Sequence, residues 1–126
     1  MFKLSARSLS RLEGVHPDLV KVVHRAIQNS TVDFAVLEGL RTPERQQQLV
    51  KAGASLTLKS RHLTGHAVDL GAMVDGKIRW DWPLYYKIAE AMKDAARDLK
   101  VSITWGGDWT MFKDGPHYEL NRKAYP

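Results

Sequence analysis

SRHLTGHAVD, the stretch at residues 60–69, ends in an aspartate that follows small and apolar residues of a predicted strand. Burying the ionised carboxylate of Asp69 in such a strand is costly unless a cation or several hydrogen-bond donors compensate. His62 precedes Asp69 across a turn that contains Gly65, so the two side chains can converge on one point. The stretch predicts either a pair of metal ligands or a hydrogen-bonded Asp–His pair without a metal.

A second segment, DGPHYEL at residues 114–120, offers a third ligand and a general base. His117 opens a predicted strand on which His117 and Glu119 share one face. Two neutral imidazoles and one carboxylate make a three-ligand zinc site whose fourth position is left for water. Asp114 stands on a tight Asp-Gly-Pro turn before His117, where a carboxylate can accept a proton from that water. The alternative for Asp114 is an aspartate that serves only the turn.

His66 is predicted to lie outside the ligand set. His62 and His66 are four residues apart, a spacing that would place both on one face of a helix. Gly65 and the strand that follows argue against a helix here, and the His-Glu-x-x-His signature of helical zinc sites is absent.

The composition of the 126-residue chain limits the kinds of site that it can build. The absence of cysteine excludes disulfides, thiolate metal sites and a cysteine nucleophile, so nitrogen and oxygen atoms must hold any transition metal. The length, and a hydrophobic content of 44%, predict a single domain over residues 1–126.

The formal net charge of +5 indicates an anionic partner. Nucleic acid, anionic lipid and the bacterial cell wall all carry suitable charge. The Lys and Arg residues are spread along the chain with no run longer than two, whereas a nucleic-acid-binding domain would cluster them on one element. We therefore predict no nucleic-acid partner and a dispersed basic surface.

No stretch approaches the roughly 20 consecutive apolar residues of a membrane helix, so membrane insertion is not expected. The N-terminal segment MFKLSARSLSRLEGV lacks the continuous apolar core of a secretory signal. We expect a protein that is made in the cytosol and is released by another component if its target lies outside the membrane.

The hydrophobic pattern predicts an α+β domain with a small, mostly antiparallel sheet. Pro17 stands in a favourable first-turn position of one helix, Thr42 is expected to cap a second, and Asp81 a third. Asp75-Gly76 is typical of a hairpin between two short strands. The predicted helices span residues 17–29, 43–52 and 83–99, the predicted strands span 32–40, 67–73, 77–80, 101–105 and 117–120, and a loop spans 55–65.

These motifs resemble those of a known family. The pattern Ser-x-His-x-x-Gly-x-Ala-x-Asp at residues 60–69, followed downstream by an acidic residue three positions before a histidine, is similar to the D-Ala-D-Ala carboxypeptidase and L-alanyl-D-glutamate peptidase family. The resemblance extends to GLRT at residues 39–42 and WGGDW at residues 105–109. It implies the Hedgehog/DD-peptidase zinc fold, and the compact chain looks most like phage endolysins that cut the L-alanyl-D-glutamate bond.

By this resemblance His62, Asp69 and His117 bind Zn²⁺, and Asp114 is the general base. Many relatives carry glutamate at the base position, so the shorter aspartate must sit closer to the water, and Asp108 is the substitute candidate. The implied reaction is hydrolysis of the stem peptide of bacterial peptidoglycan by metal-activated water.

Four residues are candidates for contact with the substrate. Arg41 is expected to stabilise the oxyanion or to clamp a substrate carboxylate, because its planar fork suits carboxylates; the alternative is a surface arginine. Ser60 is expected either to hydrogen-bond the substrate or to cap the turn. Trp105 either lines the substrate groove or packs in the core, and Asp108 is also included among the substrate-binding candidates.

Two other functions stay open at this point. The chain could be a D,D- or L,D-carboxypeptidase for cell-wall remodelling, or a non-catalytic zinc-fold protein that binds the wall. Asp114 argues against the second, because a purely structural site needs no base. Manganese or cobalt can also occupy a site with nitrogen and oxygen ligands. We expect a monomer that is made in the host bacterial cytoplasm and reaches the wall through a holin.

Overall fold

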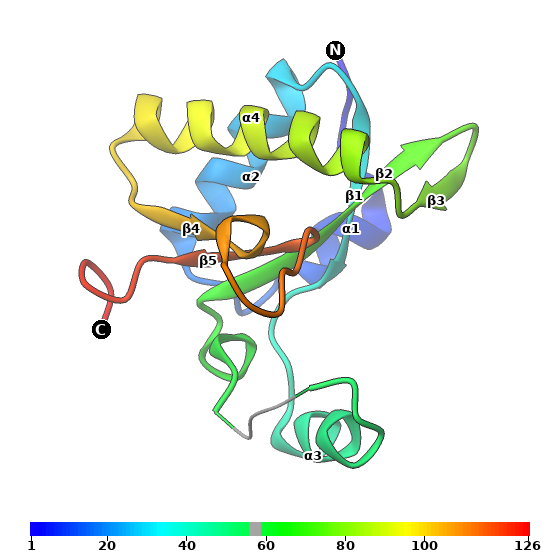
Figure 1. Cartoon of the computed structure of the whole chain (residues 1–126). Helices are drawn as coiled ribbons and strands as arrows, with labels where there is room; N and C mark the ends of the chain where they lie inside the picture. Colours follow the sequence, from blue (N-terminus) through cyan, green and yellow to red (C-terminus); the bar gives the residue numbers. More distant parts are fainter. Residues whose placement is uncertain (56–58) are drawn as a thin grey trace.

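The computed structural model describes residues 1–55 and 59–126, and it is an α+β fold built on one antiparallel sheet (Figure 1). The elements in chain order are α1 (Ala6–Arg11), α2 (Pro17–Asn29), β1 (Asp33–Glu38), α3 (Pro43–Lys51), η1 (Arg61–Thr64), β2 (Ala67–Val74), β3 (Lys77–Arg79), α4 (Trp82–Leu99), β4 (Ile103–Trp105), η2 (Gly106–Asp108) and β5 (His117–Leu120). The predicted fold class is therefore confirmed.

Strand β2 organises the five-stranded sheet. The strand order is β1-β2-β5-β4, with β3 paired to β2 through the Asp75-Gly76 hairpin, and the pairs are antiparallel. The register between β2 and β5 places Asp69 directly opposite His117. Since side chains alternate across a strand, Val68 and Leu70 turn to the other face, where both are fully buried.

Helices α2 and α4 pack together above the core face of the sheet (Figure 1). Helix α2 buries an apolar stripe at helical spacing. The stripe consists of Leu19, Val22, Val23, Ala26 and Ile27. From β5, Tyr118 and Leu120 enter the same core with no exposed surface. His117 and Glu119, which alternate with them along β5, face the opposite side of the sheet, where the site lies.

Several predicted elements lie close to where the sequence pattern placed them. Helix α2 begins at Pro17, and Thr42 caps α3 by accepting a hydrogen bond from the backbone N–H of Arg45. Asp81 occupies the N-cap position of α4 but makes no capping hydrogen bond, and its carboxylate pairs with Arg79 at 2.5 Å. The prediction that Asp81 caps this helix was wrong in this respect, because a guanidinium is a stronger partner for a carboxylate than an amide.

Helix α1 was not predicted, because six residues are too few to show a helical stripe. It covers the edge of β1 through two hydrogen bonds to Val36. The Val36 amide donates to Ser8 Oγ at 3.0 Å, and Arg11 Nη1 donates to the Val36 carbonyl at 3.0 Å. The helix therefore closes a strand edge that would otherwise be open to pairing with another chain.

The segment predicted as a loop at residues 55–65 contains the 3-10 turn η1, and its residues 56–58 lie outside the described part of the chain. Gly65 ends this turn with a φ of +75°, a left-handed conformation that glycine adopts without strain. The backbone N–H of His16 donates to the Gly65 carbonyl at 2.8 Å. Gly65 thus fixes the path from η1 into β2.

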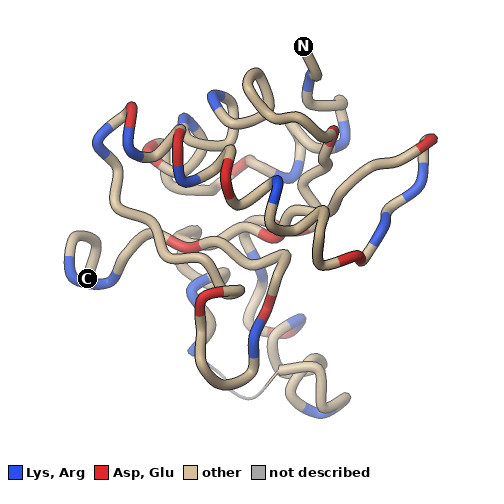
Figure 2. The backbone as a smooth tube through the Cα atoms, turned by 45° about the horizontal axis from the view of Figure 1, so that its top comes forward, with Lys and Arg blue, Asp and Glu red and all other residues tan. Residues whose placement is uncertain are grey.

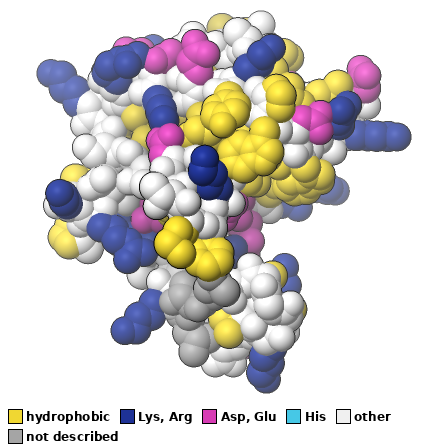
Figure 3. Space-filling view, viewed as in Figure 1, with side chains coloured by type: hydrophobic (Ala, Val, Ile, Leu, Met, Phe, Trp, Pro, Cys, Tyr) yellow, Lys and Arg dark blue, Asp and Glu magenta, His cyan; other side chains and the backbone are white. Residues whose placement is uncertain are grey.

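Charged residues are dispersed over the molecule, as the sequence suggested (Figure 2). Exposed aromatic side chains gather near the start of α4, where Trp80 is 60%, Trp82 38% and Tyr86 56% exposed (Figure 3). Among the described residues, no helix combines the length and the apolar character that a membrane crossing requires.

We expect Gly65→Ala to destabilise the protein more than Gly53→Ala. Both glycines have a φ of +75°, so each substitution carries the same left-handed strain, about 1 kcal/mol. A Cβ at Gly65 would also lie 2.4 Å from the carbonyl oxygen of Gly14, whereas a Cβ at Gly53 meets no described atom within 4 Å. Steric overlap should add about 1–3 kcal/mol for Gly65→Ala.

Urea unfolding of the two variants measures this difference. Equal losses of unfolding free energy would show that the contact with Gly14 does not restrict the turn.

Candidate metal centre and active site

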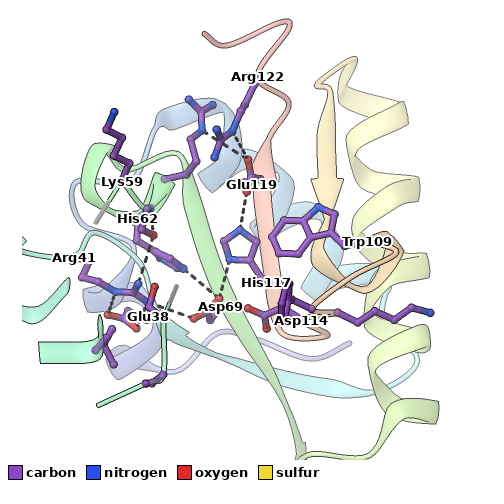
Figure 4. A pocket seen from close by; sticks show the side chains of 18 residues that line it. Glu38, Arg41, Lys59, His62, Asp69, Trp109, Asp114, His117, Glu119 and Arg122 are labelled. Atoms are coloured by element: carbon purple, nitrogen blue, oxygen red, sulfur yellow. Dashed lines mark hydrogen bonds and ion pairs between the residues drawn. The ribbon is translucent and has the colours of Figure 1, made fainter. Parts of the chain in front are cut away.

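Two imidazoles and one carboxylate converge on the open face of the sheet (Figure 4). One ligand atom from each of His62, Asp69 and His117 can be chosen so that all three lie within 4.8 Å of one another. Asp69 Oδ1 is 3.2 Å from His62 Nε2 and 3.3 Å from His117 Nδ1. These are the residues that the sequence proposed as ligands, and they come from η1, β2 and β5, respectively.

The outer nitrogen of each imidazole is already engaged. His62 Nδ1 donates to the carbonyl of Gly39 at 2.9 Å, and His117 Nε2 donates to Glu119 Oε1 at 2.9 Å. A neutral imidazole carries one N–H, so these bonds leave lone pairs on the two nitrogens that face Asp69. Two lone pairs and a carboxylate oxygen repel one another unless a cation lies between them. The donor set therefore fits a divalent metal such as Zn²⁺.

The electrostatics of the cluster show the same requirement for positive charge. Burial by itself would raise the pKa of Asp69, but its hydrogen bonds with His117 and His62 hold that pKa well below the ordinary value. Burial would lower the pKa of His117, yet the bonds to Asp69 and Glu119 raise it to about 9. Asp69 stays ionised, and either a proton on His117 or a metal ion must balance its charge.

Asp114 lies beside Asp69 and His117 in the same cavity (Figure 4). Its backbone is tied on both sides, because its amide donates to the Gly106 carbonyl at 3.1 Å and its carbonyl accepts from the His117 amide at 3.2 Å. Burial, followed by the negative charge of Asp69, raises the pKa of the Asp114 carboxyl group. A carboxylate of raised pKa in a cavity is a stronger base than an exposed one.

The cavity has a volume of about 750 Å³, and the three ligand candidates and Asp114 line it. Ser60 lines it too, while its Oγ accepts a hydrogen bond from the His62 amide at 3.2 Å, so Ser60 both caps η1 and faces the cavity. Trp109 also lines it, with its ring centroid 5.2 Å from that of His117.

Two of the proposed substrate-binding residues lie away from this cavity. Trp105 is buried in the core, stacked with Tyr118, and its indole N–H donates to the Gly115 carbonyl at 2.7 Å. Of the two alternatives for Trp105, the structure shows the core position. Asp108 is exposed and pairs with Lys93 at 2.7 Å. Neither residue is among the described residues that line the cavity.

Arg41 is buried at the cavity wall rather than on the surface. Its Nε and Nη2 bind the two carboxylate oxygens of Glu38, each at 2.7 Å, and its Nη1 donates to Gln46 Oε1 at 2.7 Å. Arg41 Nη2 is 3.9 Å from Asp69 Oδ2. Since Glu38 fills the planar fork, the structure argues against a bidentate clamp by Arg41 on a substrate carboxylate.

The roles of two carboxylates near the site were not predicted from the sequence. The hydrogen bond from Arg41 lowers the pKa of Glu38. Glu38 follows a bulge in β1, between Val36 and Glu38, that no local sequence signal marks. Glu119 was placed on the same strand face as His117, but its direct bond to the imidazole was not predicted. His66 lies outside the cluster, as expected, with its Nδ1 2.7 Å from Thr64 Oγ1.

Sequence comparison places the chain among peptidoglycan peptidases. The profile of the family described as phage L-alanyl-D-glutamate peptidase matches residues 1–125. The L-alanyl-D-glutamate peptidase of Escherichia phage T5 is 34% identical over 128 residues, covering 98% of this chain and 93% of the phage protein.

Solved structures agree with this assignment. The crystal structure of the Serratia marcescens L-Ala D-Glu endopeptidase ChiX is 50% identical, with a TM-score of 0.93 over 98% of this chain and 94% of that chain. The vancomycin-resistance D,D-dipeptidase VanXYg, 22% identical with a TM-score of 0.57 over 84% of this chain and 50% of that chain, shares the fold. The chain belongs to the phage L-alanyl-D-glutamate peptidase family, as the motif at residues 60–69 predicted.

Proposed function

We propose that this chain is a zinc-dependent endopeptidase that hydrolyses the bond between L-alanine and D-glutamate in the stem peptide of peptidoglycan. The observation that carries the proposal is the convergence of His62, Asp69 and His117, with both outer imidazole nitrogens engaged. The relatives from phage T5 and Serratia marcescens bear the names of peptidases for this bond, which supports the choice of substrate.

The three ligand candidates would hold the zinc ion through His62 Nε2, a carboxylate oxygen of Asp69 and His117 Nδ1. When bound, zinc supplies Lewis acidity toward the peptide carbonyl and toward a water molecule. Residues 1–126 would act as one catalytic domain, since α2, α4, β1, β2, β4 and β5 contribute to a single hydrophobic core.

Asp114 is the proposed proton carrier. Its raised pKa suits a carboxylate that accepts a proton from the attacking water and later returns one. The water oxygen bonds to the carbonyl carbon of L-alanine, and the bond from that carbon to the D-glutamate nitrogen breaks. Asp114 passes the proton to the leaving nitrogen, which gives a carboxylic acid and an amine. The acid then loses the second proton of the water and the amine gains one, so the products at neutral pH are a carboxylate and an ammonium group.

We propose Arg41 as a donor to the oxyanion that forms on the carbonyl oxygen. The two bonds to Glu38 hold its guanidinium in place, and Nη2 has a second hydrogen beyond the one that Glu38 accepts. A donor fixed before the reaction stabilises developing charge without reorganisation. Ser60 and Trp109 both line the cavity and are candidate substrate contacts. Trp109 replaces Trp105, the aromatic residue that was expected from the sequence to line the substrate groove.

We expect Asp114→Asn to lower kcat by about 100-fold or more, because the amide side chain of asparagine cannot accept the proton of the attacking water. Zinc content should stay stoichiometric, since Asp114 is not among the three converging ligands. Turnover on purified peptidoglycan and metal analysis of the same preparation measure the two effects. Asp108 is the competing candidate for the base. If Asp108→Asn lost activity and Asp114→Asn kept it, Asp108 would be the base instead.

We expect His117→Ala to abolish tight zinc binding and the thermal stabilisation that zinc provides. A ligand at 1,000 times its Kd stabilises a folded protein by about 4 kcal/mol, so wild-type protein should melt at higher temperature with zinc than after chelation. His66→Ala is the matched control, since His66 belongs to the same motif but lies outside the cluster. Stoichiometric zinc in His117→Ala would contradict the ligand set.

The cleaved bond is identified by digesting peptidoglycan and weighing the fragments by mass spectrometry. New fragments with N-terminal D-glutamate are expected. Released D-alanine would instead indicate a D,D- or L,D-carboxypeptidase, and intact peptidoglycan with zinc-loaded protein would indicate a protein that only binds the wall.

We also propose that the chain acts as a monomer on its substrate, without inserting into a membrane or binding nucleic acid, and that it reaches the wall from the host cytoplasm through a holin. Its similarity to a phage T5 peptidase supports this route. Co-expression with and without a holin, followed by measurement of lysis, tests it.

A further inference from the structure

Glu119 is a buried carboxylate whose partner is a candidate metal ligand rather than solvent. Its side chain is 8% exposed, and its Oε1 lies 2.9 Å from His117 Nε2 (Figure 4). Burying an ionised carboxylate is unfavourable unless charged or hydrogen-bonding partners compensate. The position of Glu119 on β5 therefore calls for an explanation beyond packing.

We propose that Glu119 is a positioning residue for His117, an inference that rests on the proposed zinc function. By accepting the Nε2 hydrogen, Glu119 holds His117 in the tautomer whose Nδ1 lone pair faces Asp69. The negative charge also makes the imidazole a stronger electron donor to a metal. The outer nitrogen of His62 instead bonds the neutral carbonyl of Gly39.

Arg61 forms a largely buried ion pair with Glu119. Its Nε is 3.8 Å from Glu119 Oε2, its side chain is 12% exposed, and its Nη2 donates to the carbonyls of Leu120 at 3.1 Å and Tyr125 at 2.7 Å. These two bonds hold the guanidinium against the end of β5. Arg61 immediately precedes His62 in the chain. The turn η1 therefore supplies the ligand candidate His62 and also the ion-pair partner of Glu119, which in turn bonds His117.

Arg122 contacts the same carboxylate from the outside. Its Nε is 3.4 Å from Glu119 Oε2, but its side chain is 68% exposed. Ion pairs of exposed side chains contribute little because solvent screens them. Arg122 is therefore the comparison for Arg61. Both are cations near one oxygen, but Arg122 donates a hydrogen bond from an exposed side chain, whereas Arg61 Nε forms only an ion pair from a largely buried one.

The test is the zinc dissociation constant, measured by competition with a chromophoric chelator. We expect Glu119→Ala to weaken zinc binding by roughly 10- to 100-fold, which is the usual effect of removing such a partner. Glu119→Gln keeps the shape and an acceptor oxygen but loses the charge, so an intermediate loss is expected. We expect Arg61→Ala to weaken binding as well, and Arg122→Ala to change it less than about threefold.

Proton NMR of the zinc-loaded protein reports directly on the hydrogen bond between His117 and Glu119. A purely structural role of Glu119 in packing would not change this signal. The Nε2 proton of His117 should resonate far downfield in the wild type and move upfield in Glu119→Gln, which retains the fold. An unchanged dissociation constant and an unchanged resonance in Glu119→Gln would overturn the inference.

The two proposals fail in different ways. If the wild-type protein neither binds zinc nor cleaves peptidoglycan, the proposed function is wrong. If the wild type does both and the Glu119 variants bind zinc with the wild-type constant, only the positioning role of Glu119 is wrong.

Discussion

An ionised carboxylate placed between two imidazoles is the constraint on which the rest of the site depends. The antiparallel register of β2 and β5 sets Asp69 opposite His117, and η1 brings His62 to 3.2 Å from the same oxygen. Such a cluster is stable only with positive charge inside it. The surrounding protein therefore has to fix the imidazole hydrogens outward, and the Gly39 carbonyl and Glu119 do so.

Much of this arrangement could be predicted from the sequence, because the ligand residues differ chemically from their neighbours. Asp69 is a carboxylate in an apolar strand, and His117 begins a strand whose alternate residues are Tyr118 and Leu120. Period-two alternation assigns such residues to opposite faces without any knowledge of the fold. The convergence of His62 with Asp69 needed only a short turn, for which Gly65 gives a local signal.

The sequence could not assign residues whose roles depend on long-range geometry. Trp105 and Trp109 flank the same pair of glycines, and only the pairing of β4 with β5 shows that Trp105 enters the core while Trp109 borders the cavity. Glu38 and Arg41 are three residues apart, a spacing common in surface ion pairs. Here the Arg41 side chain is only 8% exposed, and it also donates to Gln46, a long-range arrangement that the spacing does not indicate.

The chain leaves the site at Arg41 and returns to it at Ser60, and the two ends are fastened to each other. The Arg41 amide donates to the His62 carbonyl at 2.9 Å, and Arg41 Nη1 is 3.5 Å from Ser60 Oγ. Helix α3, which belongs to the intervening segment, stands apart from the sheet (Figure 1). Since lengthening a closed loop adds little entropic cost, the number of residues between Gln46, which accepts from Arg41, and Ser60 can change while Arg41 and Ser60 keep their places at the cavity wall.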